Sequence, residues 1–312
     1  MRRVGFAFHP SFLAHDTGPG HPERPQRLAA ICAHLREAGL WPQLIPLDPP
    51  AAPRAVLELV HPPAYVNAIA EACRRGPTGL DSDTVASPGS WEAACRAVGA
   101  VTHAIDAVMT GTVRAAFCAV RPPGHHALAD RAMGFCLFNN VAIGARYAQQ
   151  RHQVERVLIV DWDVHHGNGT QAVFEQDPSV CYFSTHQAPF YPGTGSRAQR
   201  GAGTVVNVPL PSGSGDAEVL RAMREELLPA AARFRPELIL ISAGFDAHQD
   251  DPLAGLRMTE TGYREATRIV RALADAHCAG RLVSVLEGGY DLDALSRSVA
   301  AHLQELLNGD EP

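Results

Sequence analysis

The sequence contains no lysine, and all 27 of its basic residues are arginines. This absence excludes Schiff-base catalysis through a lysine and a phosphate-binding loop that depends on one. Basic runs are also missing, and the net charge is −6 at pH 7. Both features argue against a surface that neutralises phosphates. We therefore expect no nucleic acid among the partners of this protein.

Long apolar runs and paired cysteines are lacking too. Arg, Asp or Glu interrupts each apolar stretch before it reaches the length of about 18 residues that suggests a membrane-spanning helix. The N-terminal segment reaches a proline before the apolar core of a signal peptide could form. The seven cysteines are scattered and never form a CxxC pair, which is typical of buried free thiols in a reducing compartment. The sequence predicts a cytoplasmic protein without membrane contact.

Short β-branched runs do alternate with longer helical patterns. Strands are predicted at residues 4–8, 115–120, 156–163, 180–186, 204–210, 237–244 and 281–288. Helices are predicted at residues 24–39, 89–111 and 259–280, the last with Thr259 as N-cap and Gly280 as C′ residue. The proline-rich stretches 45–53 and 208–215 are predicted loops. The alternation favours a three-layer α/β fold with a mostly parallel, doubly wound sheet, and we expect residues 1–312 to form a single domain.

Polar residues follow five of the predicted strands. They are His125, His126, Asp161, Asp163, His165, Ser184, His186, Asp246 and Tyr290. In an open α/β sheet, ligands bind outside the carboxyl ends of the strands. The sequence therefore predicts a functional site at this edge of the sheet.

Three of these residues suit a divalent metal ion. Asp163 and His165 are two positions apart, so an extended backbone would point both side chains the same way. Asp246 follows another strand and is the expected third ligand. A single Asp at a strand end is more often a cap or a turn residue, but the string DWDVHH favours the metal. Three protein ligands leave an open position, which is typical of a catalytic site.

The tandem histidines and the tyrosine suggest hydrolytic chemistry. His125 and His126 follow a PPG turn, and such a pair alone is more often structural. A carboxylate at Asp161, however, would raise the pKa of one imidazole and leave the other free as a neutral general base. Tyr290 follows Gly288 and Gly289. It is either a core residue or a donor to a developing oxyanion, and the two glycines favour a mobile turn that brings it to a ligand.

Six strings in this order resemble the histone deacetylase family: RPPGHHA, GFCLFNN, DWDVHHGNGTQ, STHQAPFYPGTG, SAGFDAHQDDPLAG and LEGGY. The resemblance extends from about residue 21 to residue 290 and includes the bacterial histone-deacetylase-like amidohydrolases and acetylpolyamine amidohydrolases. It implies the arginase-like α/β fold and a Zn²⁺-dependent hydrolase of acetylated amines. Acetyl-lysine side chains are the expected substrates and acetylpolyamines are the alternative. Iron in place of zinc stays open, as does a homodimer or homotetramer.

The same resemblance implies a role for each residue of the site. Asp163, His165 and Asp246 match the zinc ligands, and Tyr290 matches the phenol that polarises the carbonyl. His126 matches the base and acid, with Asn168 as its partner in place of the acid that many relatives have. His125, paired with Asp161, would stabilise charge. An internal K⁺ site is implied as well, partly through backbone carbonyls, by Asp161, Asp163, His165, Ser184 and Thr185.

The resemblance also implies a narrow tunnel for the acylated chain. Its walls match Phe135 and Tyr191, with Gly134 and Gly289 beside them, and Tyr191 stands where Phe is common. Leu253 is expected at the tunnel mouth, where polyamine-selective relatives carry an acid, so it favours a neutral substrate. Carboxylates at the mouth would oppose this preference, and the candidates are Asp83, Asp250 and Asp251.

Two rival functions remain. The string DAHQD at residues 246–250 fits ureohydrolases, which share the fold but need a second acid-rich strand end for two manganese ions. We interpret this match as chance, with His248 and Asp250 as surface-loop residues. The other rival is a non-catalytic protein that binds acyl-lysine, although every expected catalytic position is filled.

Overall fold

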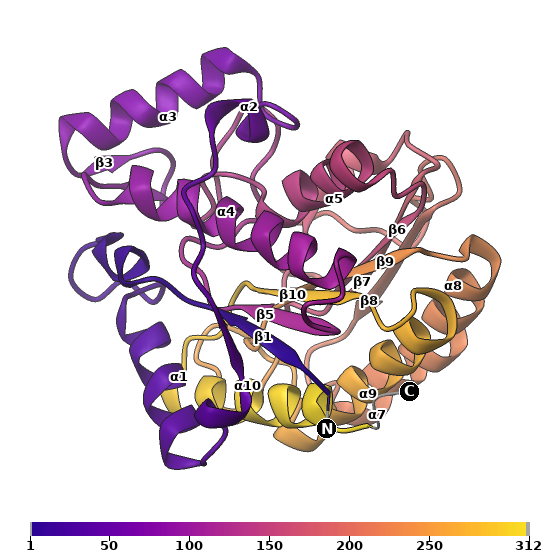
Figure 1. Ribbon diagram of the computed structural model, residues 1–312. Helices are drawn as coiled ribbons and strands as arrows, with labels where there is room; N and C mark the ends of the chain where they lie inside the picture. Colours follow the sequence, from indigo (N-terminus) through magenta and orange to yellow (C-terminus); the bar gives the residue numbers. More distant parts are fainter. Residues whose placement is uncertain (1, 310–312) are drawn as a thin grey trace.

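An eight-stranded parallel sheet forms the centre of the computed structural model, which describes residues 2–309 (Figure 1). The strand order is β2-β1-β5-β10-β9-β6-β7-β8, and every neighbouring pair is parallel. The strands are β1 (Val4–Ala7), β2 (Ile45–Leu47), β5 (Ala115–Cys118), β6 (Val157–Asp161), β7 (Val180–Gln187), β8 (Val205–Leu210), β9 (Leu238–Ala243) and β10 (Leu282–Leu286). The predicted α/β architecture with a parallel sheet is confirmed.

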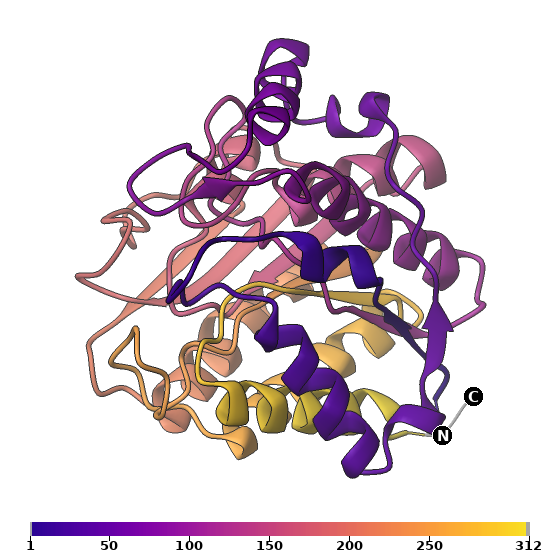
Figure 2. The same ribbon diagram turned by 90° about the vertical axis from the view of Figure 1, so that its left-hand side faces the viewer.

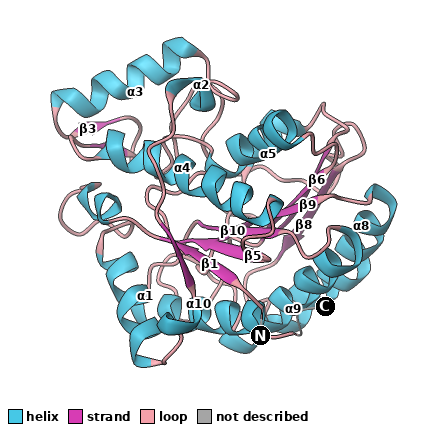
Figure 3. Ribbon diagram, viewed as in Figure 1, coloured by secondary structure: helices cyan, strands magenta, loops and turns pink. Residues whose placement is uncertain are grey.

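Helices cover both faces of this sheet (Figures 1 and 3). One layer contains α1 (Gln26–Glu37), α7 (Asp216–Ala222), α8 (Leu228–Phe234), α9 (Glu260–His277) and α10 (Leu292–Leu307). The opposite layer contains α4 (Ser90–Met109), α5 (Asn140–His152) and α6 (Asn168–Phe174), with α2 (Arg54–Leu57) and α3 (Pro63–Arg75) beyond them. A π-helical turn, Met223–Leu227, joins α7 to α8, and 3₁₀ turns occur at Pro10–Ala14 and Trp41–Gln43. The result is the expected three-layer arrangement.

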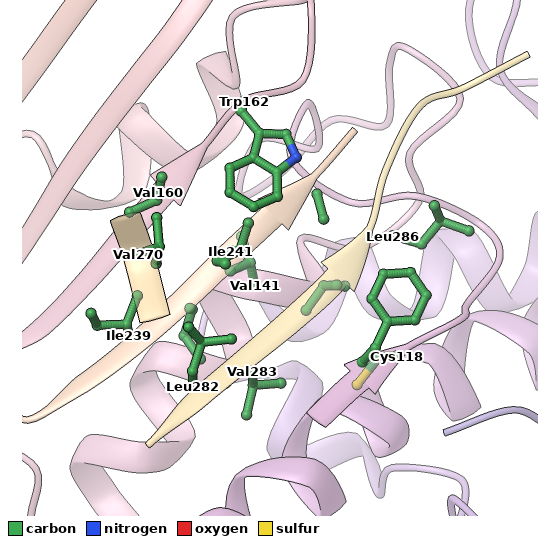
Figure 4. Packing of buried hydrophobic residues seen from close by; sticks show 14 of the residues in the cluster. Cys118, Val141, Val160, Trp162, Ile239, Ile241, Val270, Leu282, Val283 and Leu286 are labelled. Atoms are coloured by element: carbon green, nitrogen blue, oxygen red, sulfur yellow. The ribbon is translucent and has the colours of Figure 1, made fainter. Parts of the chain in front are cut away.

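The strands read as continuous apolar runs because both of their faces are covered. Every residue of β6, β9 and β10 is buried. Figure 4 shows Ile239 and Ile241 of β9 beside Leu282 of β10, with the Trp162 ring above the end of β9. The Trp162 side chain is only 1% exposed although it lies just beyond β6. The apolar core therefore continues up to the residues that follow the strands.

Most predicted elements are confirmed, with boundaries shifted by one to three residues. Thr259 is the N-cap of α9, and its side chain accepts a hydrogen bond from the Gly262 N–H. The prediction for the other end was wrong, because α9 ends at His277 with Cys278 as its C-cap. Ala279 and Gly280 then both adopt positive φ angles, of 51° and 79°. The C′ residue is therefore Ala279, and Gly280 lies one position beyond it.

The prediction of a loop over residues 45–53 was also wrong at its start. Residues Ile45–Leu47 form β2, which pairs with β1 at the edge of the sheet. Pro46 is tolerated there because an edge strand has a partner on one side only and can lose one N–H donor. A two-stranded antiparallel ribbon of β3 (Thr78–Gly79) and β4 (Val85–Ala86) had no prediction at all.

The cysteines behave as the sequence suggested. All seven are free and buried. Burial raises the pKa of the Cys32 and Cys73 thiols to about 11. None of the helices within residues 2–309 combines the length and the apolar character that a membrane crossing requires.

A buried ionic cluster joins the N-terminal part of the chain to the loops after β5 and β10. The Glu23 carboxylate accepts hydrogen bonds from the guanidinium groups of Arg27 and Arg121, and all three side chains are fully buried. Arg27 also donates to the backbone carbonyls of Glu287 and Gly289, which lie after β10. Although burial alone would raise it, the pKa of Glu23 is lowered to about 2, mainly by the charge of Arg121. Glu23 is therefore the shared anion of two buried cations.

Candidate active site

The polar residues that follow the strands meet at one edge of the sheet, around a cavity of about 440 Å³. The neighbouring strands β5, β10, β9 and β6 lead into it, since they are parallel and their carboxyl ends share that edge. The lining residues are His21, Pro22, Ser82, Asp83, Pro123, His125, His126, Gly134, Phe135, His165, Tyr191, Leu253, Gly288 and Tyr290. Most residues predicted for the tunnel and its catalytic groups are therefore brought together.

Asp163, His165 and Asp246 form the predicted cluster of metal-binding side chains. One potential ligand atom from each lies within 4.8 Å of the others. His165 Nδ1 lies 3.0 Å from Asp163 Oδ1 and 3.2 Å from Asp246 Oδ2. Asp246 Oδ2 is buried and has no partner with hydrogen-bond geometry. A buried carboxylate oxygen without a partner is costly, so this atom favours a bound cation.

The backbone reaches this arrangement differently from the prediction. The strand β6 ends at Asp161, and Asp163 to His165 form a turn rather than extended chain. Asp163 Oδ1 accepts a hydrogen bond of 2.8 Å from the His165 N–H, which closes the turn. The expectation of an extended backbone was therefore wrong, although the two side chains do meet.

The electrostatics of the cluster also favour a cation. Burial and the charge of Asp163 raise the pKa of Asp246 to about 7. Burial opposes protonation of His165, but its contacts with Asp163 and Asp246 raise its pKa to about 10. Two buried carboxylates this close repel each other unless positive charge lies between them. A divalent cation would supply that charge, and an Asp₂His set is a chemically suitable site for Zn²⁺.

His125 is paired with Asp161, as the sequence suggested. Its Nδ1 lies 3.0 Å from Asp161 Oδ2, which also accepts a hydrogen bond from the Tyr182 hydroxyl. Burial alone would lower the pKa of His125, but the charges of Asp161, Asp163 and Glu287 raise it well above the usual value. His125 is therefore suited to carry a positive charge.

His126 has the opposite character. Its Nδ1 lies 2.8 Å from Asn168 Oδ1, which only accepts hydrogen bonds. The proton of the neutral ring is therefore on Nδ1, and Nε2 has a free lone pair. Burial lowers the pKa of His126 well below the usual value, and the charges of His125 and His165 act in the same direction. This imidazole is suited to accept a proton.

Tyr290 lines the same cavity and is held at its backbone. Its N–H donates to Asp251 Oδ2 over 2.7 Å, and the Arg27 guanidinium lies 5.1 Å from the centre of its ring. Burial raises the pKa of Tyr290 well above its usual value, so the phenol keeps its proton. Gly288 has a packing role, because a Cβ there would lie 2.0 Å from Asp246 Oδ2. This glycine lets the loop after β10 approach the metal-binding cluster.

Aromatic rings form the walls of the cavity. The ring of Phe135 lies 5.9 Å from that of Tyr290, and Tyr191 lies 5.1 Å from His126, both edge to face. Gly134 has a φ of 55°, and a Cβ there would lie 2.4 Å from the ring of His126. Gly289 was expected to line the cavity, but Gly288 does so. The Gly289 carbonyl instead accepts a hydrogen bond from Arg27, because the loop turns it towards that side chain.

Residues 21–306 match the family model of the histone deacetylase domain. The chain belongs to the histone deacetylase family. It is 40% identical over 312 residues to a histone deacetylase-like amidohydrolase of Pseudomonas aeruginosa, covering 93% of this chain and 82% of that protein. It is 41% identical to the human polyamine deacetylase HDAC10 over 93% of this chain and 45% of that protein. The solved structure of the HDA15 HD domain superimposes with a TM-score of 0.94 at 40% identity, covering 98% of this chain and 88% of that one.

Membership in the histone deacetylase family makes the chain an amide hydrolase. The structure also shows which of the predicted residues lie at the mouth of its cavity. Leu253 and Asp83 both line the cavity. Asp251 does not face the mouth, because it is buried and accepts from the N–H groups of Leu253 and Tyr290. Asp250 is exposed but is not among the lining residues. Of the three carboxylates considered for the mouth, Asp83 is the one that lines it.

His248 does not lie where the sequence suggested. It was expected in a surface loop, yet its side chain is 1% exposed. Its Nδ1 accepts a hydrogen bond from the Asp250 N–H, and its Nε2 lies 3.6 Å from Glu260. The expectation was wrong because the loop after Asp246 folds back onto the segment just before α9, where the Met258 N–H donates to the Ala247 carbonyl.

Of the five residues predicted for a monovalent cation, Asp161, Ser184 and Thr185 lie on two neighbouring strands, whereas Asp163 and His165 follow the end of β6. Asp161 ends β6 and is in register with Ser184 of β7, and Thr185 follows. All three are buried. The Ser184 hydroxyl is already hydrogen-bonded to His186 Nδ1 over 2.9 Å. A cation here would therefore depend on backbone carbonyls and the Asp161 carboxylate.

Sequence reasoning assigned no role to four lining residues: His21, Pro22, Ser82 and Pro123. His21 Nε2 lies 2.9 Å from the Asp83 carbonyl, and its ring packs edge to face on Phe135 at 4.7 Å. The resemblance to the family begins at about residue 21, but it implied no role for His21. Contact between residues 21 and 83 depends on the fold and has no local signal.

Proposed function

We propose that this chain is a Zn²⁺-dependent deacylase that removes acetyl groups from acylated amines, with acetyl-lysine side chains as the preferred substrates. Residues 1–312 would act as one catalytic domain. The observation that carries this proposal is the cavity itself, which combines the Asp163–His165–Asp246 cluster, a neutral His126 and the Tyr290 phenol. The buried free thiols support a reducing compartment such as the cytoplasm.

The chemistry divides among these residues. Zn²⁺ bound by the cluster would polarise the amide carbonyl and lower the pKa of a water to about 7. His126 Nε2 takes a proton from the attacking water and returns it to the leaving amine. Tyr290 donates a hydrogen bond to the oxygen of the former carbonyl as its negative charge develops. His125, held by Asp161, provides positive charge beside the same atoms.

The proposal extends to a second ion and to the substrate. Asp161, Ser184 and Thr185 would hold K⁺ behind the catalytic residues, where it would stabilise the buried carboxylate of Asp161. Phe135 and Tyr191 would enclose the linear chain of the substrate. The narrow apolar walls suit a methylene chain such as that of lysine.

One experiment tests the function directly. Purified protein is analysed for metal and assayed on a panel of acetyl-lysine peptides and acetylpolyamines. We expect one zinc or iron per chain, turnover of the peptides, and loss of turnover after chelation that is restored by Zn²⁺. Metal-loaded protein that binds the peptides without cleaving them would instead indicate a non-catalytic acyl-lysine binder.

Replacing Tyr290 by Phe removes the donor to the oxyanion. We expect kcat to fall on the order of 10²–10³-fold, as when other oxyanion donors are lost, while the bound metal is retained. Tyr191→Phe is the matched control, since it removes a hydroxyl from the wall of the cavity, and its kcat should stay close to wild type. Undiminished turnover by Tyr290→Phe would contradict the assigned role.

Leu253 is expected to set the preference between substrates. We expect acetyl-lysine peptides to be cleaved faster than acetylspermidine, because Leu253 offers no charge to a distal ammonium group. Leu253→Glu should shift the ratio of kcat/KM towards the polyamine by about 10–100-fold, as a carboxylate at a partly desolvated mouth attracts cations. Leu253→Gln controls for polarity without charge.

Acetylpolyamines are the alternative substrates, and Asp83 at the mouth is the observation that favours them. Wild-type protein that already prefers acetylspermidine, with no change in Leu253→Glu, would refute the role of Leu253. Asp83→Asn would then be the variant that lowers polyamine turnover.

A further inference from the structure

Glu287 is a buried carboxylate beside the site that neither binds the metal nor lines the cavity. It follows β10 and is fully buried. Its Oε2 accepts hydrogen bonds from the backbone N–H groups of Gly124, over 2.6 Å, and His125, over 3.2 Å. Its Oε1 accepts a third from the Ser242 hydroxyl of β9, over 3.0 Å. The side chain therefore connects three segments that enter the site.

The segment that carries the tandem histidines depends on this contact. The strand β5 ends at Cys118, so the N–H groups of Gly124 and His125 have no neighbouring strand to bond with. Buried backbone N–H groups need acceptors, and Glu287 supplies the one for both. Without it, the turn that aims His125 and His126 loses the partner of two successive N–H groups.

The main chain of Glu287 leads directly to the catalytic tyrosine. Its carbonyl accepts a hydrogen bond from Arg27, and the next N–H, of Gly288, donates to Asp163 Oδ2 over 2.9 Å. Tyr290 follows two residues later. One residue thus connects to the histidine pair through its side chain and to the tyrosine through its backbone.

We propose that Glu287 is a positioning residue, which sets the histidine pair relative to Tyr290 through the location of its acceptor oxygen. This inference rests on the proposed function. Its negative charge, which also acts on His125, offers a rival explanation of any effect on turnover. Acceptor position and charge can be separated because the two conservative substitutions change one each.

Two variants separate the explanations. Glu287→Gln keeps the chain length, so its amide oxygen can accept from Gly124 and His125 while its amino group donates to Ser242. We expect its kcat to stay within about threefold of wild type. Glu287→Asp keeps the charge but withdraws the acceptor by one methylene. We expect its kcat to fall about 10–100-fold with little change in KM and in bound metal, because misplacement of about 1 Å can cost 10²-fold in rate.

Amide hydrogen exchange provides a readout that does not depend on turnover. In Glu287→Asp the amides of Gly124 and His125 should exchange at least tenfold faster than in wild type, with or without metal, while Glu287→Gln should protect them. Ser242→Ala is the matched control, since it removes only the contact to Oε1, and both amides should remain protected.

Several outcomes would overturn the proposal. Lower activity in the Gln variant than in the Asp variant would assign the role to charge. Loss of folding in Glu287→Asp alone would show that the residue stabilises the fold as a whole. Unchanged kcat and unchanged exchange in Glu287→Asp would show that the acceptor position is unimportant. If wild-type protein cleaves no acetylated amine, the proposed function fails, and the exchange measurement still tests the contact.

Discussion

Asp246→Ala is expected to abolish both metal binding and turnover, whereas Asp250→Ala should retain both. Asp246 supplies a buried oxygen without a hydrogen-bond partner to the cluster. Losing a ligand should cost more than the roughly 10–100-fold in metal affinity that the loss of an outer-shell partner costs. Asp250 is exposed, and its nearest ionic partners are His248 and Arg297. Elemental analysis measures the bound metal of both variants, and an acetyl-lysine assay measures their turnover.

The pair of variants also tests the rival reading of the string DAHQD. In a two-manganese ureohydrolase, His248 and Asp250 would both be ligands. The structure instead directs His248 towards Glu260 and leaves Asp250 at the surface. Loss of metal in Asp250→Ala, or two manganese ions per wild-type chain, would favour the ureohydrolase and contradict the single-metal site.

Glu23→Ala is expected to lower the free energy of unfolding by about 3–5 kcal/mol. The substitution leaves the buried guanidinium groups of Arg27 and Arg121 without their shared anion, and an uncompensated buried charge has a cost of this size. Chemical denaturation monitored by circular dichroism measures the change.

A surface glutamate provides the matched control for this variant. Glu71 also pairs with two arginines, Arg74 and Arg75, but these side chains are largely exposed. Because exposed ion pairs contribute at most about 1 kcal/mol, Glu71→Ala should be nearly neutral. Equal destabilisation by both substitutions would show that losing the buried carboxylate of Glu23 costs no more than losing an exposed ion-pair partner.

Features that depend on local sequence could be predicted well. The strand ends were recognisable because parallel strands buried on both faces are continuous apolar runs, and the polar residues begin where those runs stop. The rule that carboxyl ends share one edge then brought together Asp163, His165 and Asp246 although Asp246 is about 80 residues further along the chain.

Features that depend on burial could not be predicted in the same way. His248 and Asp251 lie in a segment whose composition is typical of a surface loop, yet both are buried. The fold brings the N–H of Tyr290 to Asp251 and the Glu260 carboxylate to His248. Glu23 and Glu287 likewise receive their partners from distant segments. The spacing of residues along the chain does not predict such contacts. Pro46 is the converse case, because a residue typical of loops lies in an edge strand.

The burial of all seven thiols has a practical consequence for spectroscopy. Maleimide reagents attack thiolates, and burial keeps these groups protonated and out of reach. Amine-directed dyes also find no lysine side chain. A cysteine introduced at exposed Ser82, on the rim of the cavity, would therefore be the one fast-reacting thiol of the chain. A fluorophore attached there would report the arrival of a substrate at the cavity mouth in the otherwise unaltered protein.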